Sequence, residues 1–160
     1  MSRRFGCALA FIVAFTFATG PVSAAPLAPR KASELVSLQA SPTTTSCAAG
    51  NGRAFDLQFR PDGSTLFTFS IPAGQVLVVT DVTFQKSGLA ANATYAPAVV
   101  TDSLFSIPIV LPTVTANAAG NAGGSVSLQH GLVVRSATSI CFFDNANFTA
   151  RLHGFLAKDK

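Results

Sequence analysis

The chain has 160 residues, of which 49% are hydrophobic and only 11% charged, with a formal net charge of +4. Its Lys and Arg residues are scattered in runs no longer than two, which excludes the clustered basic patch of a nucleic-acid-binding protein. A chain of this length folds as one domain and buries about two thirds of its unfolded surface. We therefore expect a single domain with a substantial core and no nucleic-acid partner.

The first 24 residues are typical of a cleavable secretory signal peptide. Two arginines precede an apolar run, Phe5–Ala18, and Gly20-Pro21 then breaks any helix ahead of three small residues. The run is about 14 residues long, shorter than the roughly 20 that a membrane-spanning helix needs. We predict cleavage after Ala24, export to the periplasm or the extracellular space, and no membrane span in the mature chain. An uncleaved anchor and the twin-arginine export route are the alternatives.

Cleavage would leave a nearly neutral chain with two cysteines, Cys47 and Cys141. An oxidising compartment favours a disulfide between them, with two buried thiols as the alternative. Closing so long a loop would contribute on the order of 4 kcal/mol through chain entropy. The spacing of the two cysteines, and the lack of His or Cys partners near them, argue against a zinc site.

Residues 25–46 are predicted to be an N-terminal extension and linker, followed by the folded domain at 47–160. The segment 25–30 is rich in proline, and 31–40 fits either a short helix or a strand, with the strand preferred. The Ser-Pro-Thr-Thr-Thr-Ser sequence at 41–46 then resembles a linker leading to Cys47.

A β-hairpin is predicted at the start of the domain. In Thr65–Ile71 the residues Phe67, Phe69 and Ile71 alternate with Ser and Thr, which indicates a strand with one buried face. The preceding Pro-Asp-Gly-Ser sequence has the chemistry of a hairpin turn. Arg53–Phe59 is the expected partner strand.

The segment Gln75–Gln85 has the clearest strand pattern of the chain. Its inward positions are expected to be Val76, Val78, Val82 and Phe84. Its outward positions are expected to be Asp81, Thr83 and Gln85. Leu77 and Val79 make its first half apolar on both faces, so we expect this half to be central in a sheet or covered by a neighbouring segment.

The rest of the chain alternates short strands with turns. Lys86–Pro97 is predicted to be a loop that holds the single tyrosine, Tyr95, and Asn117–Gly124 is predicted to be a flexible loop. Ala98–Leu111 fits one or two strands, which Pro108 and Pro112 confine to an edge or a bulge. The remaining expected strands are 125–129, 131–135, 139–143 and 148–157.

About eight to ten short, mainly antiparallel strands with turns between them predict an all-β fold. The strand number and spacing favour a single β-sandwich of the jelly-roll type.

The sequence contains no convincing catalytic or metal-binding motif, so we expect no enzymatic activity, cofactor or metal. His130 and His153 have no partner at metal-ligand spacing, and the nucleophile motif Gly-x-Ser-x-Gly is absent. The oxygen-rich segment Asp144–Asn147 offers one carboxylate, which suits a turn better than a calcium site.

Low charge and ten phenylalanines beyond residue 24 suggest a secreted, non-catalytic β-sandwich that acts through its surface, by binding a protein or by self-assembly. The first alternative is a carbohydrate- or small-ligand-binding module with a pocket near residues 86–97 or 117–124. Sugar rings stack on Trp and Tyr, and this chain has no Trp, so Tyr95 is the single candidate ligand contact. The second alternative is a hydrolase that uses His130 or His153 with an Asp and a Ser.

Overall fold

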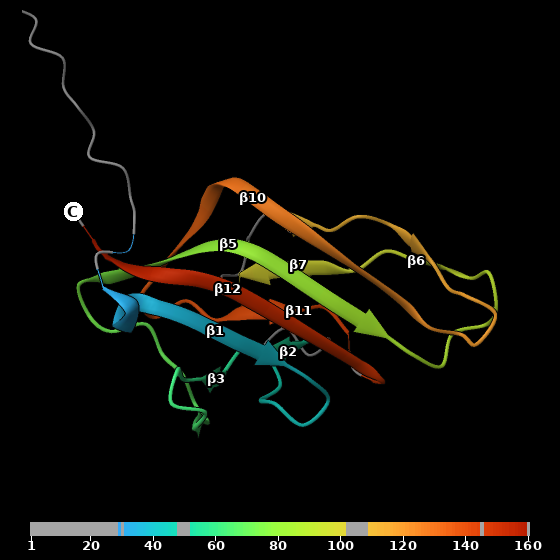
Figure 1. The fold of residues 1–160 in the computed structure, drawn as a ribbon, viewed down its shortest axis with the longest axis horizontal. Coiled ribbons are helices and arrows are strands. Elements are labelled where there is room, and N and C mark those ends of the chain that lie inside the picture. Colours follow the sequence, from blue (N-terminus) through green and yellow to red (C-terminus); the bar gives the residue numbers. More distant parts are fainter. Residues whose placement is uncertain (1–28, 30, 48–51, 102–108, 145, 160) are drawn as a thin grey trace, which may run out of the picture.

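The computed structural model describes residues 29, 31–47, 52–101, 109–144 and 146–159, and it consists mostly of antiparallel β-strands (Figure 1). The predicted all-β class is confirmed. The predicted signal peptide, residues 1–24, and the segment 25–28 after it lie outside the described residues. Within the described ranges, no helix has the length and apolar character to cross a membrane.

The described residues form one 3₁₀ turn and 12 strands. In chain order these are η1 (Ala32–Glu34), β1 (Leu35–Ala40), β2 (Arg53–Ala54), β3 (Leu57–Phe59), β4 (Thr65–Leu66), β5 (Gln75–Lys86), β6 (Thr94–Tyr95), β7 (Ala98–Thr101), β8 (Ile109–Val110), β9 (Val114–Thr115), β10 (Ala122–Arg135), β11 (Ile140–Phe142) and β12 (Phe148–Lys158).

Six strands form the main sheet, in the order β10-β5-β12-β1-β3-β4, and all of its neighbours pair antiparallel. The strand β1 pairs with β12 on one side and with β3 on the other. The sequence placed residues 35–40 in an extension ahead of the domain. In the structure they are an interior strand, because the alternation of Val36, Leu38 and Ala40 buries one face against the core.

A second sheet, in the order β2-β11-β7-β8, lies behind β5 and β12 in Figure 1, and β6 pairs with β9 as a separate ribbon. One hydrophobic cluster contains residues of both larger sheets. Phe142 of β11 lies 6.4 Å from Phe84 of β5 and 5.0 Å from Phe148 of β12, measured between ring centroids. These phenylalanines join the two sheets through their side chains.

The strand β5 contains a β-bulge at Thr80. Asp81 pairs with His153 and Val79 pairs with Gly154, so Thr80 has no partner on β12. One extra residue reverses which positions of a strand face each side of the sheet.

The bulge changes the predicted inward face of β5. After the bulge, Val82 and Phe84 lie in the main cluster, as predicted. Before it, Leu77 and Val79 occupy that cluster. Val76 and Val78 instead pack with Phe155 in a small cluster of their own, so their predicted inward orientation is wrong. The period-two rule failed here because it assumes an uninterrupted strand.

The predicted hairpin is confirmed, but it is short. Gln58 pairs with Leu66 and Phe59 with Thr65 across a turn in which Gly63 has a φ of 82°. The second strand then ends, because Thr68 adopts a φ of 68° that breaks extended structure. Phe67, expected to point inward, is 66% exposed.

Two predicted loops are shorter than expected. Tyr95 belongs to β6, which pairs with β9, so the segment 86–97 is not entirely loop. The strand β10 begins at Ala122 and continues through His130 to Arg135, so the loop before it is limited to 117–121. Edge strands were expected in Ala98–Leu111. Residues 102–108 of this segment lie outside the described residues. Its last strand, β8, lies at the edge of the second sheet.

The predicted disulfide between Cys47 and Cys141 is confirmed. It links the segment after β1 to β11, across a separation of 94 residues. Both cysteines are buried, with exposures of 6% and 1%. The bond therefore joins the region that follows a strand of the main sheet to the centre of the second sheet.

Candidate functional site

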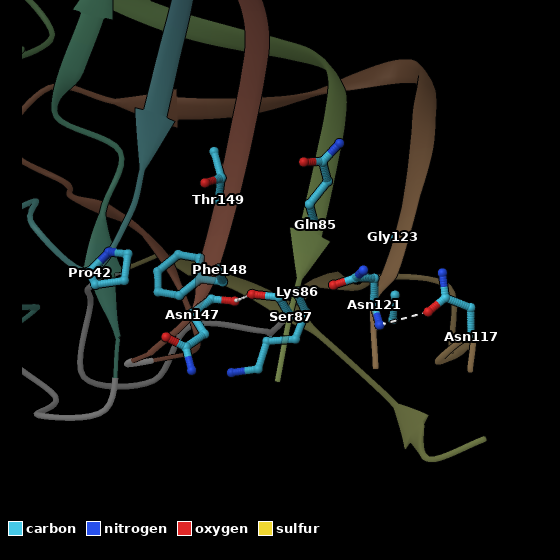
Figure 2. Close-up of a pocket in the computed structure, with 11 residues that line it drawn as sticks. Pro42, Gln85, Lys86, Ser87, Asn117, Asn121, Gly123, Asn147, Phe148 and Thr149 are labelled. Atoms are coloured by element: carbon cyan, nitrogen blue, oxygen red, sulfur yellow. Dashed lines mark hydrogen bonds between the residues drawn. The ribbon is translucent and has the colours of Figure 1, made fainter. Parts of the chain in front are cut away.

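A cleft of about 740 Å³ opens at one end of the main sheet (Figure 2). It forms where the last residues of β5 meet the first residues of β10 and β12, because Lys86 pairs with Ala122 on one side and with Phe148 on the other. The turns that follow or precede these three strands complete the walls. The site therefore combines a rigid sheet end with loop residues.

Polar side chains without charge dominate the cleft. Its lining residues are Pro42, Gln85, Lys86, Ser87, Asn117, Asn121, Ala122, Gly123, Asn147, Phe148 and Thr149. Four of them are amides and two carry hydroxyls, whereas none of them is a carboxylate. An amide offers both a donor and an acceptor, so this lining suits a ligand that presents many hydroxyl or carbonyl groups.

The amide side chains differ in how they are used. Asn117 Oδ1 accepts hydrogen bonds from the backbone N–H groups of Ala119 and Asn121, each at 3.0 Å, and so holds the 117–121 turn in place. The amides of Gln85, Asn121 and Asn147 make no hydrogen bond to any other described residue, and all three residues are exposed. These three amides are available to a ligand.

A polar cluster of Lys86, Asp144 and Tyr95 lies next to the cleft. Lys86 Nζ contacts Asp144 Oδ1 at 2.9 Å, with both side chains largely buried, and the Tyr95 hydroxyl donates to Asp144 Oδ2 at 2.6 Å. The ammonium also lies 5.7 Å from the centre of the Tyr95 ring. Burial and the hydrogen bond to Asp144 raise the pKa of the Tyr95 hydroxyl far above its ordinary value.

This cluster determines where Tyr95 lies. Its ring is partly buried, 6.1 Å from the ring of Phe84, and Tyr95 is not among the residues that line the cleft. A ligand contact by Tyr95 stays a prediction. The same contacts explain the Asp144 turn, whose carboxylate accepts from Lys86, Tyr95 and the Ala146 backbone N–H. Asn145 of that turn lies outside the described residues.

The cleft takes residues from both loops near which the sequence suggested a ligand pocket. Lys86 and Ser87 come from the first, and Asn117 and Asn121 from the second. The sequence analysis assigned Asn147 to a turn and did not place it, or Phe148 and Thr149 of β12, at a ligand site, because only the antiparallel pairing of β12 with β5 brings these residues to the cleft. The amide residues Asn117, Asn121 and Asn147, which lie next to predicted strand ends, were the sequence signal that could have indicated this cleft.

The two histidines lie elsewhere. His153 stands on the exposed face of the main sheet in a row with Ser37 of β1 and Asp81 of β5. The hydroxyls of Thr80 and Ser127 hold the pKa of Asp81 below its ordinary range. Among the described residues, however, the His153 side chain makes no hydrogen bond to Ser37 or Asp81, so the row is not a hydrogen-bonded triad.

His130 occupies the irregular part of β10, between Ser127 and Leu132, and is exposed. No group of three or more His, Cys, Asp or Glu side chains that could hold a metal ion occurs in the part of the chain that the structure describes.

No protein-family model matches this chain, and no curated protein or solved structure matches it either.

Proposed function

We propose that the chain is a secreted, non-catalytic protein that binds a polyhydroxylated ligand, a carbohydrate, in the cleft at the end of β5. The observation that carries this proposal is the lining of four amides and two hydroxyls without a carboxylate. Paired donors and acceptors match the hydroxyls of a sugar, and the lack of a carboxylate in the lining argues against acid–base chemistry there.

The apolar part of the cleft is small, and this affects the expected affinity. Phe148 is only 4% exposed, so it does not offer a flat stacking surface. Stacking contributes about 0.5–1.5 kcal/mol beyond its buried area. A site that lacks it relies on hydrogen bonds, and we expect dissociation constants in the range of about 1 mM to 1 μM.

The test is calorimetric titration of the mature chain with a panel of neutral oligosaccharides. Changing Gln85 and Asn121 together to Ala removes two hydrogen bonds worth roughly 1–3 kcal/mol, so binding should weaken about tenfold or more. Gln129→Ala is the matched control, because it removes an exposed amide of β10 that does not line the cleft. Equal affinity in the double variant and the wild type would refute the proposal.

A second function is favoured by the apolar residues on the exposed face of the main sheet. Leu35, Phe155, Val78 and Val133 follow one another across β1, β12, β5 and β10. Leu35 is 51% and Val133 is 47% exposed at the two ends of this row, whereas Val78 and Phe155 between them are only 3% and 6% exposed. We propose that two copies pair through this row, which buries the exposed surface of Leu35 and Val133.

Light scattering during size exclusion tests this second proposal, on the mature chain without reductant. A dimer that Leu35→Ser with Val133→Thr converts to a monomer would support pairing through the row. A monomeric wild type would exclude it and leave the cleft as the site of function.

We propose further that the two larger sheets form a single β-sandwich of the jelly-roll type. The shared hydrophobic cluster and the contact of Phe84 with Phe142 support this arrangement.

A further inference from the structure

A second cavity, of about 400 Å³, lies at the other end of β5 from the cleft. It is lined by Leu77, whereas the cleft begins at Gln85. Eight residues of extended chain separate these two positions by roughly 26 Å. The two sites share no lining residue.

The walls of this cavity are part of the protein core. Leu38, Phe55, Leu77 and Ile140 line it, and none of these side chains is more than 6% exposed. They come from both of the larger sheets or from segments next to them. Phe69 and Ile71 belong to the segment between β4 and β5 and add partly buried apolar surface. An apolar group in this cavity would leave water and join the core.

Two residues at this cavity have strained backbones. Thr68 has a φ of 68° and Ala137 a φ of 65°, and both line the cavity. Left-handed backbone is unfavourable for residues with a side chain, especially a β-branched one, and such strain of about 1–3 kcal/mol concentrates at ligand sites. The strained segment is anchored, because the Phe69 N–H donates to the Asp56 carbonyl oxygen at 2.8 Å. The backbone therefore holds the cavity wall in a conformation that local preferences oppose.

The polar groups around the cavity determine which ligand it would accept. Its polar lining residues are Thr45, Asp56, Thr68, Ser70, Thr138 and Ser139. Asp56 supplies the one carboxylate of this set, and none of the lining residues is Lys, Arg or His. A ligand carboxylate would meet a like charge there, whereas an ammonium or hydroxyl group could donate to these oxygens.

We propose that this cavity binds a small apolar molecule whose polar end is an amine or an alcohol. Its volume lies within the usual range of ligand pockets, about 300–1,000 Å³. The apolar part occupies the space between Leu38, Phe55 and Leu77, and the polar end faces Asp56. This site does not depend on carbohydrate binding in the cleft.

The experiment uses the neutral fluorescent probe N-phenyl-1-naphthylamine with the disulfide-bonded mature chain. We expect a saturable rise in fluorescence with one probe per chain. Octylamine should displace the probe at least tenfold more effectively than octanoate, which has the same length but the opposite charge. Asp56→Asn should reduce that preference for octylamine several-fold. A probe signal that does not saturate would overturn the proposal.

Two variants test the position of the site. Ala54→Leu adds volume inside the cavity and Ser139→Leu adds it at an exposed lining position, so each should weaken probe binding at least tenfold. Ala91→Leu is the matched control, because it adds the same bulk to an exposed turn that does not line the cavity. Wild-type probe binding in both filling variants would also overturn the proposal. Intact carbohydrate binding in the same variants would show that the cleft is unaffected.

Discussion

Tyr95 is the single tyrosine of a chain without tryptophan, and a carboxylate holds its hydroxyl. Its partner Asp144 lies 49 residues further along the chain. Taken alone, the sequence around Asp144 suggests a turn, and the sequence around Tyr95 suggests a loop. Their contact depends on the pairing of β5 with β12, which brings Lys86 opposite Phe148 and close to the Asp144 turn.

The raised pKa of Tyr95 predicts how stability depends on pH. The native state keeps the phenol proton at a pH where the unfolded chain releases it, with an ordinary pKa of 10.0. This contribution to stability is fully present below pH 10.0 and is lost as the pH rises above it. Tyrosinate absorbance should therefore appear near pH 10.0 in denaturant and at higher pH in the folded protein.

The control for this titration is Tyr95→Phe, which removes the phenol and its hydrogen bond. We expect its free energy of unfolding at neutral pH to be about 1–2 kcal/mol lower. Its stability should also fall less steeply above pH 10.0 than that of the wild type. Identical tyrosinate titrations in the folded and unfolded protein would contradict the Tyr95–Asp144 contact.

Individual strands were easier to predict than the direction in which their residues point. Period-two alternation and turn residues located the hairpin, β5, β11 and β12, because these features depend on local sequence. The bulge at Thr80, after which the other set of alternate β5 residues faces the core, was not predictable in this way. It depends on how β10 and β12 pair with β5. The cleft was suggested through its loops, but its β12 wall required knowledge of the register.

The irregular segment of β10 depends on Gly131. This residue has a φ of 67°, and a Cβ atom there would lie 2.6 Å from Val78 Cγ1. Gly131→Ala should therefore lower the free energy of unfolding by about 1–3 kcal/mol, through both the strained backbone and the clash. Gly63→Ala is the matched control, because it has positive φ but nothing within 4 Å of the added atom. Urea denaturation should show the smaller loss in the control.

Contact between the sheets can be measured with a double-mutant cycle. Phe84 and Phe142 belong to different sheets and their ring centroids are 6.4 Å apart. Replacing each with Leu, singly and together, should reveal a coupling energy of about 0.5–1.5 kcal/mol. Additive effects of the two substitutions would mean that the sheets do not pack through these rings.

At the scale of the whole molecule, one disulfide bond and one pair of strands join parts of the chain that lie far apart in the sequence. The disulfide joins Cys47 to Cys141, and β1 pairs with β12 near the two ends of the described chain. The disulfide was predictable from the number of cysteines and the expected compartment. The central position of β1 was not, because its partners lie 18 to 22 residues away in β3 and 110 to 120 residues away in β12.

Removing the disulfide should lower stability without changing the fold. Replacing Cys47 and Cys141 with Ser opens a loop of 94 residues, and the expected cost is about 4 kcal/mol or somewhat less. Urea denaturation of the double variant, and of the wild type with and without reductant, measures this loss. The reduced wild type should approach the double variant, and equal midpoints in all three samples would contradict the prediction.

The pairing of β1 with β12 also has a mechanical consequence. Leu35 lies opposite Phe155, so tension applied to the two ends of the chain would act at the same end of this strand pair. Hydrogen bonds loaded in this way separate one after another, which needs little force. The disulfide would then stop extension at Cys47 and Cys141, and the segment between them would carry no tension until the sulfur–sulfur bond is reduced.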